Sequence, residues 1–389
     1  MPKCPSRRSF LATGLALPAA ASANQAASAG RPAGMTYSVL GKTGLKVSRL
    51  GMGGNVASDP SVIALAVDLG INFFDTARSY NNGNTERMLG AVLKGKRKDV
   101  VLQTKTQAKT KDAALGELES SLKEMGTDYL DIWHLHGRNA PAEIDDGLFE
   151  AQRVAKQQGK IRFAGVSMHF TMKDMIPYLM KIGQTDVILT AYNFSMPPEM
   201  EMEKTLAAAH RAGVGMIAMK TMAGGFARIQ RGDRLYTDNP QALTARLKQP
   251  GAMPAALRWA LRNRNVDTVI AGMVDREQLE ENIAATPATF TDADGKLLAA
   301  QLEFIRPLYC RMCGECAGKC PQGLPVADML RILSYADGYG EFSFARDRFR
   351  ELPESVRQVR CGQCSECAIE CPNGVRVAER LRKAQDWLA

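Results

Sequence analysis

The sequence predicts an α/β protein: a closed barrel of eight parallel strands, each followed by a helix, and then a small, mainly helical domain. Three observations support this fold class. Short apolar runs alternate with amphipathic helical segments between residues 35 and 300. Polar side chains stand where these apolar runs end. Eight of the nine cysteines lie after residue 309, in two groups, and none lies between residues 35 and 309.

The apolar runs predict eight strands of a length typical of barrels. They cover residues 48–52, 72–75, 100–105, 130–136, 163–168, 187–193, 215–220 and 268–273. Helical patterns fill the gaps, and some carry clear boundaries. One helix follows Asp59-Pro60 and ends at Gly70, and another covers residues 111–125 and ends at Gly126. Eight such units predict a (β/α)8 TIM barrel over residues 35–300. An open doubly wound sheet is the alternative, but no strand–turn–helix unit carries a GxGxxG fingerprint.

Six polar side chains that could do chemistry stand at the carboxyl ends of predicted strands. They are Asp75, Lys105, His136, Ser167, Asn193 and Lys220. In barrels of this kind the active site is built at the carboxyl ends of the strands. The clustering therefore predicts an enzyme rather than a structural barrel.

The eight C-terminal cysteines form two quartets with the same spacing. Each reads C-x2-C-x2-C-x3-C followed by a proline, Pro321 or Pro372. This is the spacing of bacterial ferredoxins that hold two clusters, in which the fourth cysteine of each quartet binds the other cluster. The predicted ligands are Cys310, Cys313, Cys316 and Cys371 for one [4Fe-4S] cluster, and Cys361, Cys364, Cys367 and Cys320 for the second.

Disulfides and zinc are the alternatives for these cysteines. Four disulfides packed at two-residue gaps would be strained, although an exported protein meets oxidising conditions. Zinc sites usually use two CxxC pairs rather than quartets. The insert between the quartets, residues 326–360, shows helical periodicity. We therefore expect residues 301–389 to form a helical, ferredoxin-like domain with two clusters.

The N-terminus predicts an export signal. Residues 6–11 read SRRSFL, a mildly apolar run follows, and residues 21–23 read ASA, which is typical of a cleavage site. This segment resembles a twin-arginine signal, whose machinery exports folded proteins and so suits clusters assembled in the cytoplasm. We expect residues 1–23 to be removed, residues 24–34 to be a flexible linker, and the mature protein to be periplasmic. A disordered Ala-rich leader is the alternative.

Charge and hydropathy exclude two classes of partner. The net charge is +9, and the basic residues are scattered except for one dense run over residues 94–98. A single run of this kind is typical of a solvated helix end, so we expect no nucleic-acid partner. No apolar stretch reaches the length needed to cross a bilayer, so we expect no permanent membrane span.

Four segments, in order, resemble the aldo/keto reductase family. Residues 35–53 resemble its opening hairpin and first strand, and residues 74–80, FDTARSY, resemble its Asp–Tyr motif. Residues 103–105, QTK, and residues 128–137, DYLDIWHLHG, resemble the strands that carry its lysine and histidine. With the cysteine-rich tail, the chain resembles the iron–sulfur branch of that family.

The resemblance implies hydride transfer between a nicotinamide cofactor, NAD or NADP, and a carbonyl or alcohol group of a small-molecule substrate. A tyrosine is too weak an acid near neutrality unless its phenolate is stabilised. Tyr80 would supply the proton, Lys105 would stabilise the phenolate, and Asp75 would hold Lys105. His136 would orient the carbonyl oxygen. His134 competes for this role, because residues two apart in a strand point the same way.

The nicotinamide site of the family is matched less closely. Met168 and Met219 stand where the family usually has an asparagine and a tyrosine, and the usual partners of the 2′-phosphate are also replaced. The sequence therefore does not decide between NAD and NADP. The residues that the resemblance places at the cofactor are Ser167, Asn193, Lys220, Gly272, Arg276, Gln278, Glu281 and Asn282.

Three functions follow from these patterns. The first is an exported oxidoreductase whose electrons are linked to the clusters and to a donor or acceptor protein. Because soluble nicotinamide pools are cytoplasmic, its cofactor would be bound before export. The second is an electron-transfer protein with a non-catalytic barrel, and the third is a redox sensor.

Overall fold

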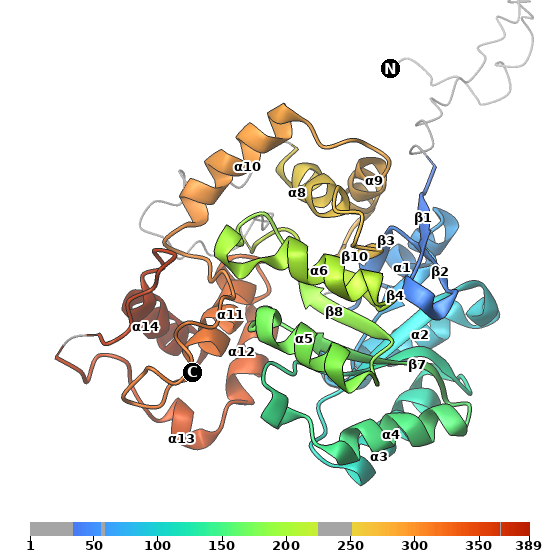
Figure 1. Cartoon of the computed structure of the whole chain (residues 1–389), viewed down its shortest axis with the longest axis horizontal. Coiled ribbons are helices and arrows are strands. Elements are labelled where there is room, and N and C mark those ends of the chain that lie inside the picture. The colour runs from blue at the N-terminus through green and yellow to red at the C-terminus, as the bar shows by residue number, and fades with distance from the viewer. Residues whose placement is uncertain (1–33, 56–58, 225–250, 366) are drawn as a thin grey trace, which may run out of the picture. The chain divides into compact units, whose positions relative to one another are not determined.

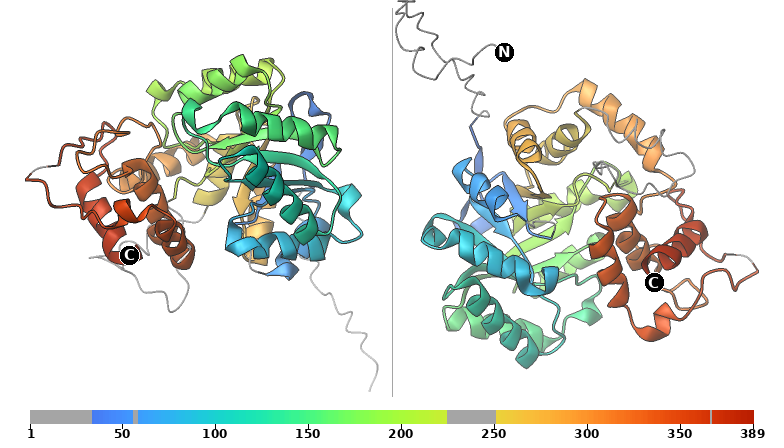
Figure 2. Two further views of the ribbon diagram at one scale, coloured as in Figure 1. Left: turned by 90° about the horizontal axis from the view of Figure 1, so that it is seen from below. Right: turned by 180° about the vertical axis from the view of Figure 1, so that it is seen from behind.

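Eight parallel strands close into a barrel, and helices surround them (Figures 1 and 2). The structure is a computed structural model that describes residues 34–55, 59–224, 251–365 and 367–389, all in one compact unit. The predicted signal and, apart from Gly34, the predicted linker lie outside the described residues. The strand order around the barrel is β10-β3-β4-β5-β6-β7-β8-β9. The predicted TIM barrel is therefore confirmed.

All eight predicted barrel strands are present, with their boundaries shifted by at most two residues. They are β3 (Leu50–Gly53), β4 (Phe73–Asp75), β5 (Val101–Thr106), β6 (Leu130–Leu135), β7 (Ile161–Met168), β8 (Val187–Ala191), β9 (Gly215–Met219) and β10 (Thr268–Gly272). Parallel strands in a barrel are buried on both faces, which explains why these segments are apolar runs rather than alternating patterns.

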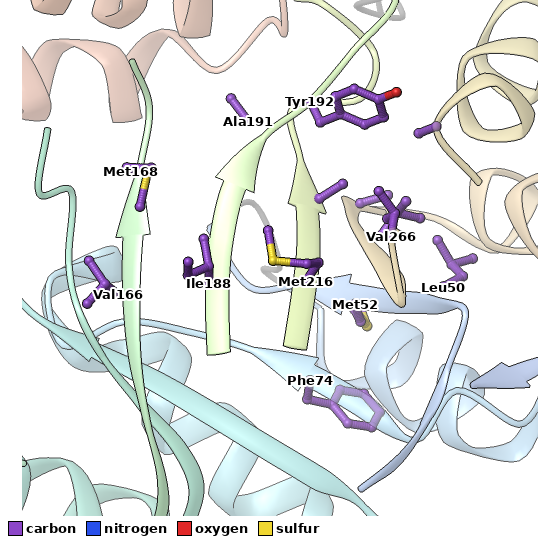
Figure 3. Packing of buried hydrophobic residues seen from close by; sticks show 14 of the residues in the cluster. Leu50, Met52, Phe74, Val166, Met168, Ile188, Ala191, Tyr192, Met216 and Val266 are labelled. Carbon is purple, nitrogen blue, oxygen red and sulfur yellow. The ribbon is translucent and has the colours of Figure 1, made fainter. Parts of the chain in front are cut away.

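Successive side chains of each strand enter two different apolar clusters. Phe73 and Leu189 belong to the cluster inside the barrel, whereas Phe74 and Ile188 pack toward the surrounding helices. Figure 3 shows three residues of this outer cluster: Ile188 and Met216, from the neighbouring strands β8 and β9, and Phe74, from β4. The alternation fixes which polar residues at the strand ends face the barrel axis.

An antiparallel hairpin closes the barrel at the end where the strands begin. It consists of β1 (Tyr37–Val39) and β2 (Lys46–Ser48), with a 3-10 turn, η1 (Gly41–Thr43), between them. Leu40, Leu45 and Val47 are buried in the interior cluster of the barrel. Gly41 has a φ of 49°, and a Cβ there would lie 2.4 Å from the Gly215 nitrogen. Only glycine fits this close approach of hairpin and barrel.

Helices cover the outside of the barrel, and their ends follow the predicted signals. α1 (Pro60–Asp68) begins after Asp59, whose carboxylate accepts from the Ser61 nitrogen at 2.8 Å. α3 (Lys111–Met125) ends at Gly126, which adopts a φ of 61°. The others are α2 (Asn84–Leu93), α4 (Asp146–Gln157), α5 (Met172–Ile182), α6 (Met202–Arg211), α8 (Ala252–Leu261), α9 (Arg276–Ala285) and α10 (Asp292–Ile305). Short 3-10 turns are η2 (Tyr80–Gly83), η3 (Arg97–Asp99), η4 (Pro141–Glu143) and η5 (Pro198–Met200).

The C-terminal domain is helical, as predicted, and has its own core. Its helices are α11 (Val326–Asp337), α12 (Phe342–Arg350), α13 (Glu354–Arg357) and α14 (Val377–Leu388). Leu330, Phe349 and Leu381 are buried together where these helices meet. Arg380 of α14 pairs with Asp337 at the end of α11. No helix in the described part of the chain is long and apolar enough to cross a membrane.

Candidate functional site

Three strands bring the predicted catalytic residues to one end of the barrel. Asp75 ends β4 on the same face as Phe73, which lies in the barrel interior. Lys105 stands near the end of β5, also on the inward face, and His136 follows β6 directly. Because the strands are parallel, these positions converge at the carboxyl end of the barrel.

Lys105 is the centre of the site, and every proton of its ammonium has an acceptor. Its Nζ lies 2.6 Å from Asp75 Oδ1, donates to the Thr76 carbonyl at 2.7 Å, and lies 3.3 Å from the Tyr80 hydroxyl. Gln103 donates to Asp75 Oδ1 at 2.7 Å. The lysine is 2% exposed, so this geometry is held by a closed set of protein contacts.

Burial acts on the pKa of each member of this group. It lowers the pKa of Lys105 and raises that of Asp75, and the ion pair between the two opposes both shifts. Burial also raises the pKa of Tyr80 well above its ordinary value, and the charge of Asp75 adds to this effect. Tyr80 therefore keeps its proton at neutral pH. The expected stabilisation of the phenolate by Lys105 does not outweigh burial, so Tyr80 is set to donate.

The structure distinguishes between His134 and His136, the two candidates for orienting the carbonyl oxygen. His136 lines the cavity, and its ring lies edge-on to the Tyr80 ring, with centroids 5.8 Å apart. Burial, followed by the charge of Lys105, lowers the pKa of His136 well below its usual value, so the ring is neutral. His134 is fully buried and its Nε2 lies 2.8 Å from Gln103 Oε1. Only His136 is placed to meet a substrate.

A cavity of about 940 Å³ opens above these residues. This volume is within the range of small-molecule and cofactor sites. Asp75, Tyr80 and His136 lie in its wall. Further charged, polar and aromatic lining residues from the barrel and from the C-terminal domain include Lys109, Arg138, Asn139, His169, Lys220, Arg331, Tyr335, Phe344 and Arg348, and the acidic residues Glu143, Asp328, Glu341 and Glu351.

The contribution of α11 and α12 to this cavity was not predicted. Arg331 and Tyr335 belong to α11, and Phe344 and Arg348 belong to α12. Each pair joins an arginine to an aromatic residue four positions away, which places both on one helix face. This spacing is visible in residues 326–360 and is the signal that could have indicated a functional face.

The residues that the family resemblance places at the nicotinamide divide into two sets. Lys220, Gly272, Gln278 and Asn282 line the cavity. The described lining does not include the other four, which are Ser167, Asn193, Arg276 and Glu281.

Most polar atoms of the second set already have partners. The Ser167 hydroxyl accepts from the Gly137 nitrogen at 2.9 Å. The Asn193 amide donates to the Lys220 carbonyl at 3.1 Å. Arg276 donates to Glu280 at 2.9 Å. Ser167 and Asn193 thus hold the segments at Gly137 and Lys220, whereas the Arg276 contact stays within α9.

Asn282 tests whether the cavity fits a nicotinamide dinucleotide. Its Oδ1 is buried at the cavity wall and accepts no hydrogen bond from any described residue. A buried amide oxygen of this kind is costly unless a ligand completes it. Met219, Met222 and Ile270 supply an apolar wall beside it. An apolar wall with a few unpaired polar groups fits a cofactor with aromatic rings.

The cysteines lie in the two groups that are expected if the fourth cysteine of each quartet binds the cluster of the other quartet. Burial raises the pKa of Cys310 to about 12, and the neighbouring thiols of Cys316, Cys313 and Cys371 act in the same direction. The other group follows the same pattern. Burial raises the pKa of Cys361, and its neighbouring thiols are those of Cys367, Cys320 and Cys364.

This arrangement differs from that of a single-ion site. All eight cysteines are free, and within the described ranges no three His, Cys, Asp or Glu side chains are arranged to hold one metal ion. Amide groups also approach the sulfurs: Asn373 Nδ2 lies 3.4 Å from Cys313 Sγ. A pocket of about 130 Å³ is lined by Cys320, Cys361, Cys364 and Cys367, the group predicted for the second cluster.

Comparisons with known proteins agree with this geometry. The aldo/keto reductase family matches residues 55–303, and a 4Fe-4S dicluster domain matches residues 309–376. The chain is 31% identical to L-galactose dehydrogenase of Arabidopsis thaliana over 280 residues, which cover 63% of this chain and 86% of that protein. It is 26% identical to the aldo-keto reductase YhdN of Bacillus subtilis (strain 168) over 317 residues, 69% of this chain and 94% of that protein.

A solved structure shares the fold of the barrel. This is the holo form of the aldo-keto reductase AKR11C1 from Bacillus halodurans, with a TM-score of 0.55 and 27% sequence identity. The match covers 69% of this chain and 96% of that structure.

Proposed function

We propose that this chain, which belongs to the aldo/keto reductase family and carries a 4Fe-4S dicluster domain, transfers hydride between NAD or NADP and a carbonyl or alcohol group of a small molecule. One observation carries the proposal. Lys105 Nζ joins Asp75 Oδ1 at 2.6 Å to the Tyr80 hydroxyl at 3.3 Å, and His136 lies beside Tyr80 at the wall of the cavity. A structural barrel has no need of a buried lysine directed at a tyrosine hydroxyl.

The side chains of this site fit the proton chemistry of carbonyl reduction. A bound nicotinamide supplies the hydride. The neutral His136 donates a hydrogen bond to the carbonyl oxygen and so fixes its position. Tyr80 donates its proton to that oxygen as negative charge develops there. The ammonium of Lys105 stabilises the phenolate that remains, and Asp75 keeps the lysine charged and in place.

The two groups of cysteines support a proposal for the clusters. One [4Fe-4S] cluster would be held by Cys310, Cys313, Cys316 and Cys371, and a second by Cys361, Cys364, Cys367 and Cys320. Each cluster, when bound, would supply one-electron transfer. An electron donor or acceptor protein would then exchange these electrons singly.

Export is the remaining part of the proposal. The motif SRRSFL at residues 6–11 and the sequence ASA at residues 21–23 support removal of a twin-arginine signal and a periplasmic location. Exchanging Arg7 and Arg8 for lysine together should retain the precursor in the cytoplasm. Cell fractionation with an antibody to the C-terminal domain measures this, and unchanged export of the double variant would contradict it.

The test of the reaction uses the mature protein, purified without oxygen, with iron and sulfide confirmed. NADH and then NADPH are added while the visible absorbance of the clusters is followed, and turnover is measured with a set of carbonyl compounds. Tyr80→Phe keeps the ring against His136 but removes the proton. We expect it to lower kcat by roughly 10²–10⁴-fold.

Tyr129→Phe is the matched control for this experiment. Tyr129 stacks on Arg97 and is not among the described residues that line the cavity. Its replacement should leave turnover unchanged. If Tyr80→Phe also left turnover unchanged, the reaction would not use Tyr80, and an electron-transfer role for the protein would be favoured.

A further inference from the structure

Two cations from different domains meet at one hydroxyl in the cavity. Lys220, which follows β9 of the barrel, donates from Nζ to the Tyr335 hydroxyl at 2.8 Å. Arg331, one turn earlier on α11, donates to the same oxygen at 3.1 Å. Tyr335 is 6% exposed, and all three residues line the cavity. The contact joins residues 115 positions apart in the sequence.

While the Tyr335 phenol is protonated, the two cations Lys220 and Arg331 face a single carboxylate, that of Asp328. Arg331 is paired with Asp328 at 2.8 Å. Among the described residues, Lys220 is paired with no carboxylate, and its ammonium meets only the phenol oxygen and aromatic faces. Burial lowers the pKa of Lys220, and its contact with the Tyr335 oxygen opposes this shift. A buried cation of this kind is stable only when an anion is supplied.

Hydrogen-bonding capacity leads to the same conclusion. An ammonium and a guanidinium can only donate. The Tyr335 oxygen accepts from both, so while the phenol is protonated its own proton points toward another acceptor. In that protonation state three donors converge, and the carboxylate beside them, Asp328, accepts from Arg331. Such an arrangement favours an anionic oxygen group, as charge-assisted hydrogen bonds to carboxylates and phosphates are among the strongest in proteins.

The backbone at Lys220 is also held in an unusual conformation. Its φ is 56°, in the left-handed region that non-glycine residues rarely adopt. Strained backbone of this type occurs preferentially at ligand sites, where the position of the side chain matters. The strain is consistent with a requirement for the ammonium at this point of the cavity.

The cluster lies one aromatic ring away from the reacting residues. The Phe344 ring packs against Tyr335 with centroids 4.9 Å apart, and against Tyr80 with centroids 6.3 Å apart. His136 completes the line at 5.8 Å from Tyr80. One small molecule can therefore place a carbonyl at Tyr80 and an acidic group at Tyr335.

We propose that Lys220, Arg331 and the Tyr335 hydroxyl bind a carboxylate or phosphate group of the substrate whose carbonyl is reduced at Tyr80. The inference rests on the proposed function, and it narrows the substrate class to oxo acids or phosphorylated carbonyl compounds. It also gives the C-terminal domain a second role, because α11 supplies two of the three ligand groups. A phosphate of the dinucleotide is the other source of the same chemistry.

Equilibrium binding to the cluster-loaded protein tests the proposal without turnover. Calorimetry under anaerobic conditions compares a 2-oxo acid with its neutral amide, and both with ADP-ribose, which carries the dinucleotide phosphates. The acid should bind at least about tenfold more tightly than the amide, since a hydrogen bond to a charged group contributes roughly 1.5–3 kcal/mol. Lys220→Met should remove this preference, and Tyr335→Phe should reduce it while preserving the shape of the cavity.

Lys109→Met is the matched control. Lys109 lines the same cavity but is exposed and takes no part in the cluster. It should leave the preference for the acid intact, which separates a specific site from a general positive field. Equal binding of acid and amide, or an unchanged preference in Lys220→Met, would overturn the proposal. A Lys220→Met variant that loses ADP-ribose and not the acid would also overturn it, and would assign the site to the dinucleotide.

The two proposals fail in different ways. If the protein reduces neutral carbonyl compounds and shows no preference for acids, the reductase remains and the anion site is lost. If the acid binds through Lys220 but no carbonyl is reduced, the reaction is wrong and the anion site stands.

Discussion

The ion pair of Asp75 and Lys105 places two opposite charges inside the barrel, at 3% and 2% exposure. Removing charges from water costs more than a single contact usually returns. Here the cost is offset by additional hydrogen bonds from Gln103 to Asp75 and from Lys105 to Thr76. The pair is therefore a place where stability and chemistry depend on the same atoms.

Breaking the pair on one side should destabilise the protein more than removing both charges. Lys105→Met leaves the Asp75 carboxylate buried without a counter-ion, and we expect a loss of about 3–5 kcal/mol in the free energy of unfolding. Adding Asp75→Asn should restore most of that stability but none of the activity. Urea unfolding of the single and double variants measures this, and additive losses would show that the pair is not coupled.

At the scale of single elements, a glycine in a strand and a glycine in a helix have different surroundings. The strand β7 contains Gly165, where an added Cβ would lie 2.3 Å from His134 Nδ1 in the barrel interior. The helix α3 contains Gly116, where an added Cβ meets nothing within 4 Å. One glycine makes room for a buried ring, and the other only adds flexibility to a helix.

The two glycines should respond to alanine in opposite directions. Gly165→Ala must displace His134 and its contact with Gln103, so we expect a loss of about 1–3 kcal/mol in the free energy of unfolding. Gly116→Ala should raise it by about 0.5–1 kcal/mol, because alanine favours the helix. Thermal or chemical unfolding gives both values, and a neutral Gly165→Ala would show that the ring can relocate.

The helix α11 places Tyr335 where its proton is held weakly. Burial by itself raises the pKa of Tyr335, but the ammonium of Lys220 and the guanidinium of Arg331 lower it to about 7. The ordinary tyrosine value is 10.0. Other titratable groups that act electrostatically with Tyr335 are Lys105, Arg348, Tyr80, Tyr309 and Tyr339.

This shift predicts a dependence of stability on pH. Because the pKa of Tyr335 is lower in the folded protein than in the unfolded chain, ionisation of Tyr335 stabilises the fold. This stabilisation is complete above the unfolded-chain pKa near 10, and it is lost as the pH falls through about 7. The stability of the protein relative to Tyr335→Phe should therefore increase between pH 7 and pH 10. Ultraviolet difference titration should also show one phenolate near neutrality, absent in Tyr335→Phe and shifted upward in Lys220→Met. A titration near pH 10 in the parent protein would contradict this.

At the scale of the whole molecule, the C-terminal domain contributes to the catalytic cavity. Besides Tyr335, its Tyr339 hydroxyl accepts from the Gly224 nitrogen at 3.0 Å. Gly338 approaches the Gly224 carbonyl so closely that an added Cβ would lie 2.0 Å from it. The part of the chain that holds the cysteines is thus packed directly on the loop that carries Lys220.

Mutation of the fourth cysteine of each quartet tests whether that cysteine binds the cluster of the other quartet. Cys371→Ser should destabilise the cluster of the first quartet, and Cys320→Ser that of the second, with loss of roughly four of eight irons in each case. Iron analysis and electron paramagnetic resonance of both variants measure this. Ser365→Ala, which changes no predicted ligand, is the control. Loss of the cluster of the mutated quartet itself would contradict the assignment.

The sequence predicted the elements well because their signals are local. Strand lengths, the cap at Asp59, the stop at Gly126 and the cysteine spacing depend on residues within one or two turns of each other. Motif order then placed Asp75, Lys105 and His136 at the strand ends and Tyr80 in the segment that follows the strand of Asp75. The choice between His134 and His136 needed the structure, because both have the same inward direction in the strand and differ only in depth.

What the sequence by itself determined is the barrel, the helical tail, the set of catalytic candidates and the two groups of cysteines. What only the tertiary structure decided is the composition of the cavity, above all the meeting of Lys220 with Arg331 and Tyr335. The physical reason is sequence separation. Local patterns specify secondary structure and its buried face, whereas the contact across 115 residues depends on how two separately folded cores pack together.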